Sequence, residues 1–481
     1  MERNSPRREP AYPGEMNDEN IRAIFDGAGD FIARQLRCGP WTLYAYAIDG
    51  LISGGDASEY VLRPITEHLV AENMMSLYEA ALNGMVYNAV ASHCKNLDDV
   101  ATKLVNGFCV VLFPTVGAVA YEVKTGEKRS LAAPDLEHTA KGPKDAFVET
   151  VRSNTSLVRR HLRTPDLRIY ETQIGRRSLT NVSLLWIDGL TSKELVRKMK
   201  ARIAQIDIDG MLFPASVEEY LTGSRKTPFP LLQYTERTDR FCNGLLKGRI
   251  GLLIDGLPVG YLAPVDVGYL MNSPEDMGKD YVSASWVRIL RYGALLLGLL
   301  LPAIYVAMSV YHRDLLPDEL VKIISESRDH LPYSSAWEVI ALLVAFELLQ
   351  ESGIHLPQSI GQSVSIVGGI VVGTTAAEAG LLSPMALIVV SIAAICGFVI
   401  PNRDFASAVR VCRFGLTVIA AICGLVGIVF GFAALLMHLL TLRSMGVPYL
   451  VIGNPGLIRR RLKMEKFRNK HLNPQDKRNQ K

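Results

Sequence analysis

Residues able to carry out chemistry are few in this chain, and their spacing forms no catalytic motif. No H-E-x-x-H, G-x-S-x-G or G-x-G-x-x-G motif opens a helix in the 481 residues. The segment 223–227 resembles a phosphate-binding loop only weakly, because it lacks the adjacent Gly-Lys pair and an earlier glycine at fixed spacing. The seven cysteines contain no C-x-x-C pair and no metal-ligand pairing with histidine. We therefore expect no enzyme, no catalytic residue, no cofactor and no bound metal.

Four carboxylates lie in or beside long apolar stretches of the C-terminal half, where charge is costly. Glu347 and Glu351 are four residues apart and would share one face of a helix. In an oligomer, such carboxylates would repeat as a ring able to select cations. For Glu338, Glu351 and Glu378 the alternative is a position at the membrane interface. For Glu347 both interpretations stay open.

The uncharged segment 356–377 mixes apolar residues with glycine, hydroxyl and amide side chains. So many polar groups suit a helix that faces water or other subunits, because lipid supplies no hydrogen-bond partner. Gly369 and Gly373, like Gly427 and Gly431, have the G-x-x-x-G spacing that also serves close packing within one bundle. We expect the helix to line a pore, with Glu347 near a mouth. The inward-facing candidates are Gln362, Ser365, Gly369 and Thr374.

The elements that must position these residues are membrane helices. Charged residues make up 21% of the chain but are concentrated before residue 286. Four stretches are apolar enough and long enough to cross a hydrocarbon core of about 30 Å. These are 292–310, 356–377, 381–400 and 414–442. The short stretch 339–349, interrupted by Glu347, is expected to be re-entrant or interfacial.

Flanking charges predict the topology. The polar N-terminus has no apolar signal segment, so the region before the first crossing is expected in the cytosol. Four crossings return the C-terminal tail, with ten Lys and Arg in 459–481, to the same side. The loop 401–413 does not fit this topology, because four crossings would place its three arginines on the side opposite the cytoplasm. A fifth crossing at 339–349 would move this loop inside but place the basic tail outside.

The N-terminal half shows a repeated pattern of strand, Asp-Gly and helix. Apolar strands end at Asp49-Gly50 and, 139 residues later, at Asp188-Gly189, and a third such pair is Asp255-Gly256. These pairs are expected to form turns, because Asp caps the turn and Gly supplies a positive φ. The apolar spacing in 20–36 predicts a helix.

The expected fold class is an α+β soluble N-terminal region of two small, related α/β subdomains, followed by an α-helical transmembrane bundle. The expected boundaries are a disordered tail 1–19, a first cytosolic subdomain 20–128, a linker 129–144, a second cytosolic subdomain 145–285, a transmembrane domain 286–442 and a basic cytoplasmic tail 443–481.

Several phrases in fixed order, over roughly residues 100–450, carry a resemblance to a known family. They include Glu137, Asn154 and Arg159 near the linker, and Thr235-Glu-Arg237 with Asp239-Arg240 further on. Further phrases are 127–130, 142–144, 182–189, 206–210, 228–230, 246–250, 290–302, 315–317, 346–369, 379–384 and 443–449. In this order the phrases resemble the A subunit of the GerA family of bacterial spore germination receptors.

The resemblance implies a multi-pass protein of the spore inner membrane with both termini in the cytoplasm. It implies a transporter-like B subunit that senses nutrients and a lipoprotein C subunit as partners. It also implies a homo-oligomer, a pentamer, that acts as a ligand-gated ion channel and triggers germination by releasing ions. One alternative is a family relative that amplifies germination without sensing nutrients. A secondary transporter is disfavoured because the membrane stretches show no repeat, and the net charge of +4 gives no case for nucleic-acid binding.

Overall fold

The computed structural model describes residues 12–67, 71–84, 86, 88, 90–124, 134, 137, 139, 141–210, 214–223, 227–328, 331, 333–354 and 378–450. They form two compact units. The first unit contains the described residues up to 223 together with 232–264, and the second contains 227–231 and 265–450. The division after Pro264 precedes the expected boundary at 285/286, which falls inside a helix.

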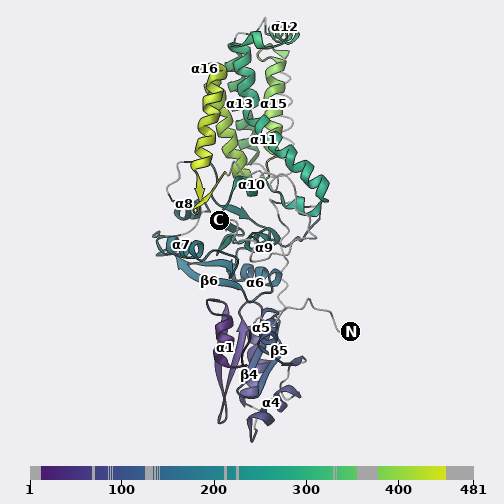
Figure 1. The fold of residues 1–481 in the computed structure, drawn as a ribbon, viewed down its shortest axis with the longest axis vertical. Coiled ribbons are helices and arrows are strands. Elements are labelled where there is room, and N and C mark those ends of the chain that lie inside the picture. The colour runs from purple at the N-terminus through teal and green to yellow at the C-terminus, as the bar shows by residue number, and fades with distance from the viewer. Residues whose placement is uncertain are drawn as a thin grey trace. The chain divides into compact units, whose positions relative to one another are not determined.

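Two five-stranded antiparallel sheets form the framework of the first unit (Figure 1). Their strand orders are β1-β2-β4-β5-β3 and β6-β7-β9-β10-β8. The order is the same in both sheets, because β6 corresponds to β1, β7 to β2, and so on to β10, which corresponds to β5. The two sheets therefore share one topology, as expected if the two predicted subdomains are related. The first sheet contains β1 (Phe31–Cys38), β2 (Trp41–Ile48), β3 (Ala91–Cys94), β4 (Phe108–Phe113) and β5 (Gly117–Glu122). The second contains β6 (Leu167–Ile174), β7 (Thr180–Ile187), β8 (Gln233–Thr235), β9 (Ile250–Ile254) and β10 (Gly260–Ala263).

The Asp-Gly pairs are turns at strand ends, as predicted. Gly50 and Gly189 have φ of 80° and 74°, and each amide donates to the side chain of the aspartate before it. The two turns are also equivalent in their wider contacts. Asp49 N donates to Asp30 O and Asp188 N donates to Asp166 O, both at 2.8 Å.

Helices cover both faces of the first sheet, which explains why β4 is apolar at every position and buried throughout. The helix predicted over 20–36 is wrong in its second half. The helix ends at Ile24, and Gly27 adopts a φ of 76°. The strand β1 begins at Phe31, because all eight of its residues pair with the eight residues of β2. The helical segments of the first unit are α1 (Asp18–Ile24), α2 (Gly54–Ala57), η1 (Ser58–Leu62), α3 (Arg63–Glu67), α4 (Met74–Leu82), α5 (Leu97–Val105), α6 (Val151–His161), α7 (Lys193–Ala204), α8 (Pro214–Thr222) and α9 (Thr238–Leu246).

The regular structure among the described residues of the second unit is helical apart from one two-stranded sheet, β11 (Arg443–Ser444) and β12 (Val447–Pro448). Two of its described helices, α11 and α16, are long and apolar enough to cross a membrane, and α15 is apolar but shorter. The stretch 339–349 lies within α13, a continuous helix of 20 residues or about 30 Å that is not one of the two candidate crossings. Its re-entrant or interfacial position stays a prediction. The helical segments are α10 (Val267–Leu270), η2 (Pro274–Gly278), α11 (Tyr281–Val310), η3 (Arg313–Leu315), α12 (Asp318–Glu326), α13 (Ser335–Ile354), α15 (Pro384–Phe398) and α16 (Arg403–Thr441).

The helix α16 reverses direction at Gly424, whose φ of 60° and ψ of −146° are not helical. A Cβ built on Gly431 would lie 2.8 Å from Leu416 Cδ2, although 15 residues of straight helix would span about 22 Å. A Cβ on Gly427 would likewise lie 2.9 Å from Ile419 Cγ2. The glycine pair 427 and 431 therefore lets two antiparallel legs pack closely (Figure 1). The prediction that 414–442 forms one crossing is wrong for this reason.

The start of the first leg of α16 and the end of its second leg both lie beside one aromatic side chain, Phe229. Its ring centroid lies 5.8 Å from that of Phe405 in the first leg and 6.2 Å from that of His438 in the second. Tyr449, after β12, packs on the same ring at 6.3 Å. Thr227 Oγ1 and His438 Nε2 form a hydrogen bond of 2.9 Å. The segment 227–231 thus holds both ends of α16 at one end of the second unit.

Candidate functional site

The predicted pore residues are described only in part. Gln362, Ser365, Gly369 and Thr374 lie outside the described residues, so their assignment to a pore stays a prediction. Glu347 lies on α13, with a side chain 53% exposed within the chain, and its Oε1 is 3.1 Å from Arg410 Nη1 of α16. Arg410 also donates to Gln350. The carboxylate therefore has a counter-charge on the neighbouring helix.

Sequence reasoning missed this pairing, because Arg410 and Arg413 served there only as markers of topology. An arginine inside an apolar helix is itself a signal, since its charge requires a partner. Arg413 is only 6% exposed and donates from Nη1 to Ala393 O of α15 at 3.0 Å. The group of Glu347, Arg410 and Arg413 joins α13, α15 and α16 and contains two positive charges and one negative charge.

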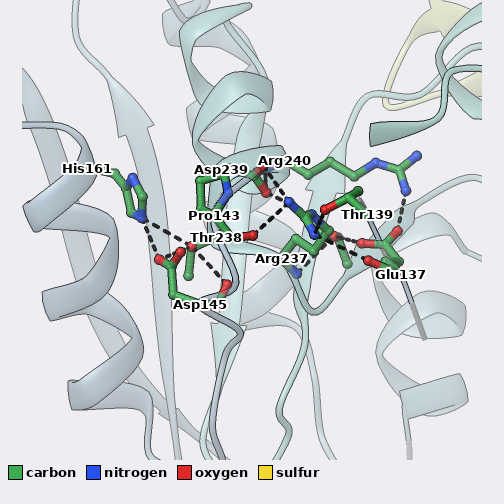
Figure 2. Close-up of polar contacts among 10 residues, drawn as sticks. Glu137, Thr139, Pro143, Asp145, His161, Arg237, Thr238, Asp239 and Arg240 are labelled. Atoms are coloured by element: carbon green, nitrogen blue, oxygen red, sulfur yellow. Dashed lines mark hydrogen bonds and ion pairs between the residues drawn. The ribbon is translucent and has the colours of Figure 1, made fainter. Parts of the chain in front are cut away.

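A buried polar network in the first unit fixes the end of the predicted linker (Figure 2). Arg237, whose side chain is 2% exposed, donates from Nη2 to Asp239 Oδ2 at 2.8 Å and to Pro143 O at 3.0 Å. Its Nη1 donates to Thr139 Oγ1 at 2.8 Å. Arg240 pairs with Glu137 in the same network. The segments 137–144 and 235–240, which carry two of the family-like phrases and are far apart in sequence, therefore meet in one network of hydrogen bonds and ion pairs.

His161, Asp145 and Thr238 form the other part of this network (Figure 2). His161 Nε2 lies 2.5 Å from Asp145 Oδ2, and Thr238 Oγ1 lies 2.5 Å from the same oxygen and 3.2 Å from the same nitrogen. In a catalytic triad the imidazole stands between acid and hydroxyl and uses both nitrogens. Here both partners meet one nitrogen, so the three side chains form a tie between α6, α9 and the linker.

This tie shifts two pKa values. The hydrogen bond from His161 outweighs burial and lowers the pKa of Asp145 to about 2, with Thr238 adding to the effect. The hydrogen bond to Asp145 outweighs burial and raises the pKa of His161 above its ordinary value. A carboxylate with a lowered pKa stabilises the fold above about pH 4, and this contribution is lost as the pH falls toward 2. A histidine with a raised pKa stabilises the fold below about pH 6.5, and this contribution is lost as the pH rises through the folded value.

The difference in melting temperature between wild type and His161→Gln is therefore expected to be largest between about pH 4 and pH 6.5. It should shrink as the pH rises through the raised pKa of His161 in the folded chain, because above that pH His161 is neutral in both the folded and the unfolded chain. Thermal unfolding of the full-length protein across this range measures it. Asp145→Asn is the matched variant and should show the same loss at high pH. A difference that does not vary with pH would contradict the charged pairing.

Known proteins similar to this chain are spore germination proteins of bacilli and a related membrane protein. The family model described as Bacillus/Clostridium GerA spore germination protein matches residues 19–479. The uncharacterized membrane protein YfkQ of Bacillus subtilis (strain 168) is 35% identical over 436 residues, which cover 90% of this chain and 85% of that protein. Spore germination protein A1 of the same strain is 36% identical over 348 residues, which cover 72% of each chain. Spore germination protein GerLA of Bacillus cereus is 30% identical over 437 residues, covering 91% and 87%.

Among solved structures, the crystal structure of the N-terminal domain of the A subunit of the Bacillus megaterium spore germinant receptor GerK3 is similar. The identity is 26%, the TM-score is 0.39, and the match covers 51% of this chain and 91% of that one. The family match spans nearly all of the sequence, and relatives more than 30% identical cover more than two thirds of it. The chain belongs to the GerA family of Bacillus and Clostridium spore germination proteins.

Proposed function

We propose that this chain is the A subunit of a nutrient-responsive spore germination receptor and that it assembles into a ring, a pentamer, that acts as a ligand-gated ion channel. The observation that carries the proposal is the family match over 19–479, together with a second unit containing helices able to cross a membrane. The site of action is the spore inner membrane. A transporter-like B subunit, which binds the nutrient, and a lipoprotein C subunit are the partners. Ligation of the B subunit favours the open ring by its differential affinity for the two states.

The reversal of α16 supports placing both termini in the cytoplasm. Because both ends of α16 contact Phe229, Arg403 at the start of the first leg and the chain after β12 belong to the same side. The arginines of 401–413 and the basic tail can then both follow the positive-inside rule. A single crossing at 414–442 would have separated them.

The pore in this proposal is lined by the segment 356–377, with Gln362, Ser365, Gly369 and Thr374 facing the ions. Two ends of described helices support a crossing here. The last two turns of α13 lie beside the first turns of α16, where Glu347 meets Arg410. The helix α15 begins beside the opposite end of α13, where Ser383 N donates to Glu338. The end of α13 and the start of α15 therefore lie at opposite ends of α13, which is the arrangement that a crossing between them requires.

Conductance of the purified full-length protein in liposomes, after its oligomeric state is fixed by native mass spectrometry, tests the channel. An oligomer that passes monovalent cations, and whose flux falls at least roughly tenfold in Ser365→Leu, is the expected result. Ser325→Leu makes the same change at an exposed position of α12, outside the proposed pore segment, and serves as the control. Normal flux in Ser365→Leu would remove 356–377 from the pore. Co-purification from spore membranes without a transporter-like B protein would favour the germination amplifier instead.

The pairing of Glu347 makes its own prediction for ion selectivity. If Glu347 lies near the pore mouth, Glu347→Gln leaves Arg410 without its carboxylate, so the preference for cations should fall by roughly 3- to 10-fold. Arg410→Gln should raise it by a similar factor, and the double variant should return close to wild type. Reversal potentials in asymmetric KCl measure the preference. Equal reversal potentials in all four proteins would place the pair away from the ion path.

A further inference from the structure

A cluster of buried oxygen atoms lies at the opposite end of α13 from Glu347. Glu338 belongs to the first turns of α13, Tyr305 and Ser309 to the last turns of α11, and Ser383 is the N-cap of α15. All four are buried, with exposed fractions of 3%, 8%, 1% and 0%. Apolar side chains of the same helices, among them Val306, Val339 and Ala386, surround them. The channel proposal gives these oxygens no role.

Three of these oxygens lack a hydrogen bond to any described residue. Glu338 Oε1 accepts from Ser383 N, but Glu338 Oε2 has no donor. The Tyr305 hydroxyl lies beside the Ser309 and Ser383 hydroxyls, yet it and Ser309 Oγ make no well-formed hydrogen bond. The Ser383 hydroxyl accepts from Ala386 N at 3.2 Å and keeps a free lone pair. Glu338 Oε2, Tyr305 OH and Ser309 Oγ, from α13 and α11, thus make no hydrogen bond to a described residue, and Ser383 Oγ at the start of α15 keeps a lone pair for a further ligand.

Burying these oxygens without partners destabilises the folded chain unless a ligand binds among them. A buried carboxylate without a counter-charge is strongly disfavoured, and each buried oxygen without a partner adds to the cost of folding. The positive N-terminus of α15 offsets only part of the charge on Glu338. Arg328 is the nearby cation, but it donates to Ser335 and to Tyr333 O and makes no ion pair with Glu338.

We propose that Glu338 Oε2, Tyr305 OH, Ser309 Oγ and Ser383 Oγ bind a monovalent metal cation, Na⁺ or K⁺. Hard oxygen ligands suit an alkali or alkaline-earth ion and not a transition metal. A site for Ca²⁺ normally contains several carboxylates, and this one contains a single carboxylate among neutral hydroxyls. The bound ion joins α11, α13 and α15. The proposal does not depend on the chain being a channel, because the ion stabilises the helices that surround it.

Thermal unfolding of the purified full-length protein in detergent, in chloride salts of Na⁺, K⁺ or choline at equal ionic strength, tests the site. At concentrations 10- to 100-fold above the dissociation constant, Na⁺ or K⁺ is expected to raise the melting temperature by about 3–10 °C relative to choline. Replacing the monovalent salt with Ca²⁺ should give no comparable rise. Equal melting temperatures in all salts would mean that the oxygens hold water only, and would overturn the proposal.

Variants separate the site from a general salt effect. Glu338→Gln should abolish the cation-specific rise, whereas Glu351→Gln, on the same helix but exposed, should retain it. Ser309→Ala and Tyr305→Phe remove one ligand each with little change in volume. They should raise the cation concentration giving half the effect by roughly 3- to 10-fold. These two decide the matter if Glu338→Gln does not fold, and an unchanged half-effect concentration in both would overturn the site.

Arg328→Gln should change the half-effect cation concentration in the opposite direction to Ser309→Ala and Tyr305→Phe. Removing a positive charge near the site should tighten cation binding and lower the half-effect concentration. If Arg328 were the true counter-charge of Glu338, the same change would leave the carboxylate alone and destabilise the protein in every salt. That outcome, without tighter binding, would also overturn the proposal.

Discussion

Replacing Asp30 with alanine is expected to lower the free energy of unfolding of the first unit by about 3–5 kcal/mol. Asp30 and Arg159 form an ion pair with side chains only 2% and 1% exposed. Arg159 Nε and Nη2 donate to the two carboxylate oxygens at 2.8 Å each. Removing the acid leaves a guanidinium buried without a counter-charge. Urea unfolding of the protein carrying Trp286→Phe and Trp337→Phe, so that only Trp41 and Trp186 of the first unit fluoresce, measures the loss.

Two comparisons isolate the cause of this loss. Replacing both partners, as Asp30→Leu with Arg159→Met, should recover much of the stability, because no uncompensated charge remains. The exposed pairs of Arg63 with Glu59 and Glu67 provide the surface control, and Arg63→Ala should change stability far less. If Asp30→Ala proved as mild as Arg63→Ala, the buried pair of Asp30 and Arg159 would not contribute to the stability of the first unit as argued from its burial.

Replacing Gly424 with valine is expected to prevent correct packing of the two legs of α16. Its φ of 60° and ψ of −146° belong to a region that is essentially restricted to glycine, and another residue there costs about 1–3 kcal/mol. A Cβ would also lie 3.0 Å from His312 Cε1 and 3.2 Å from Tyr311 Cδ2. The Tyr311 hydroxyl lies 2.9 Å from the carbonyl oxygens of Ala421 and Ile422, which the turn leaves without helical partners. Displacing Tyr311 would expose these carbonyl groups.

The measurement is the melting temperature of the purified protein in detergent, with the yield of folded protein from membranes as a second readout. Gly424→Ala should be intermediate, because it adds the strain with a smaller side chain. Gly415→Ala in the first leg of α16 is the matched control, because no atom lies within 4 Å of the added Cβ and the backbone is helical. It should leave stability unchanged or raise it slightly. Equal stability of the Gly424 and Gly415 variants would argue against a reversal at Gly424.

Local patterns were sufficient for much of the first unit. The apolar runs of β2 and β7 were recognisable because both are short, rich in β-formers and followed by an Asp-Gly turn. The Asp-Gly pairs indicated turns because their chemistry acts within two residues. The segment 20–36 failed because its apolar spacing suited a helix, while the pairing of β1 with β2 is decided by residues further along the chain. Such pairing is a tertiary contact that a single-segment pattern does not contain.

The sequence by itself determined the class of the protein, because long uncharged stretches can be buried only in lipid or in a helical bundle, and because the family phrases occur in a fixed order along most of the chain. Only the tertiary structure decided which of these stretches reverse and which charges meet. The reversal at Gly424 depends on one dihedral pair and on Tyr311, which lies 110 residues before Ala421. The partner of Glu347 lies on another helix, and the unsatisfied oxygens at Glu338, Tyr305 and Ser309 come from two helices. Hydropathy is a property of each residue alone, whereas these features depend on distances between residues remote in the chain.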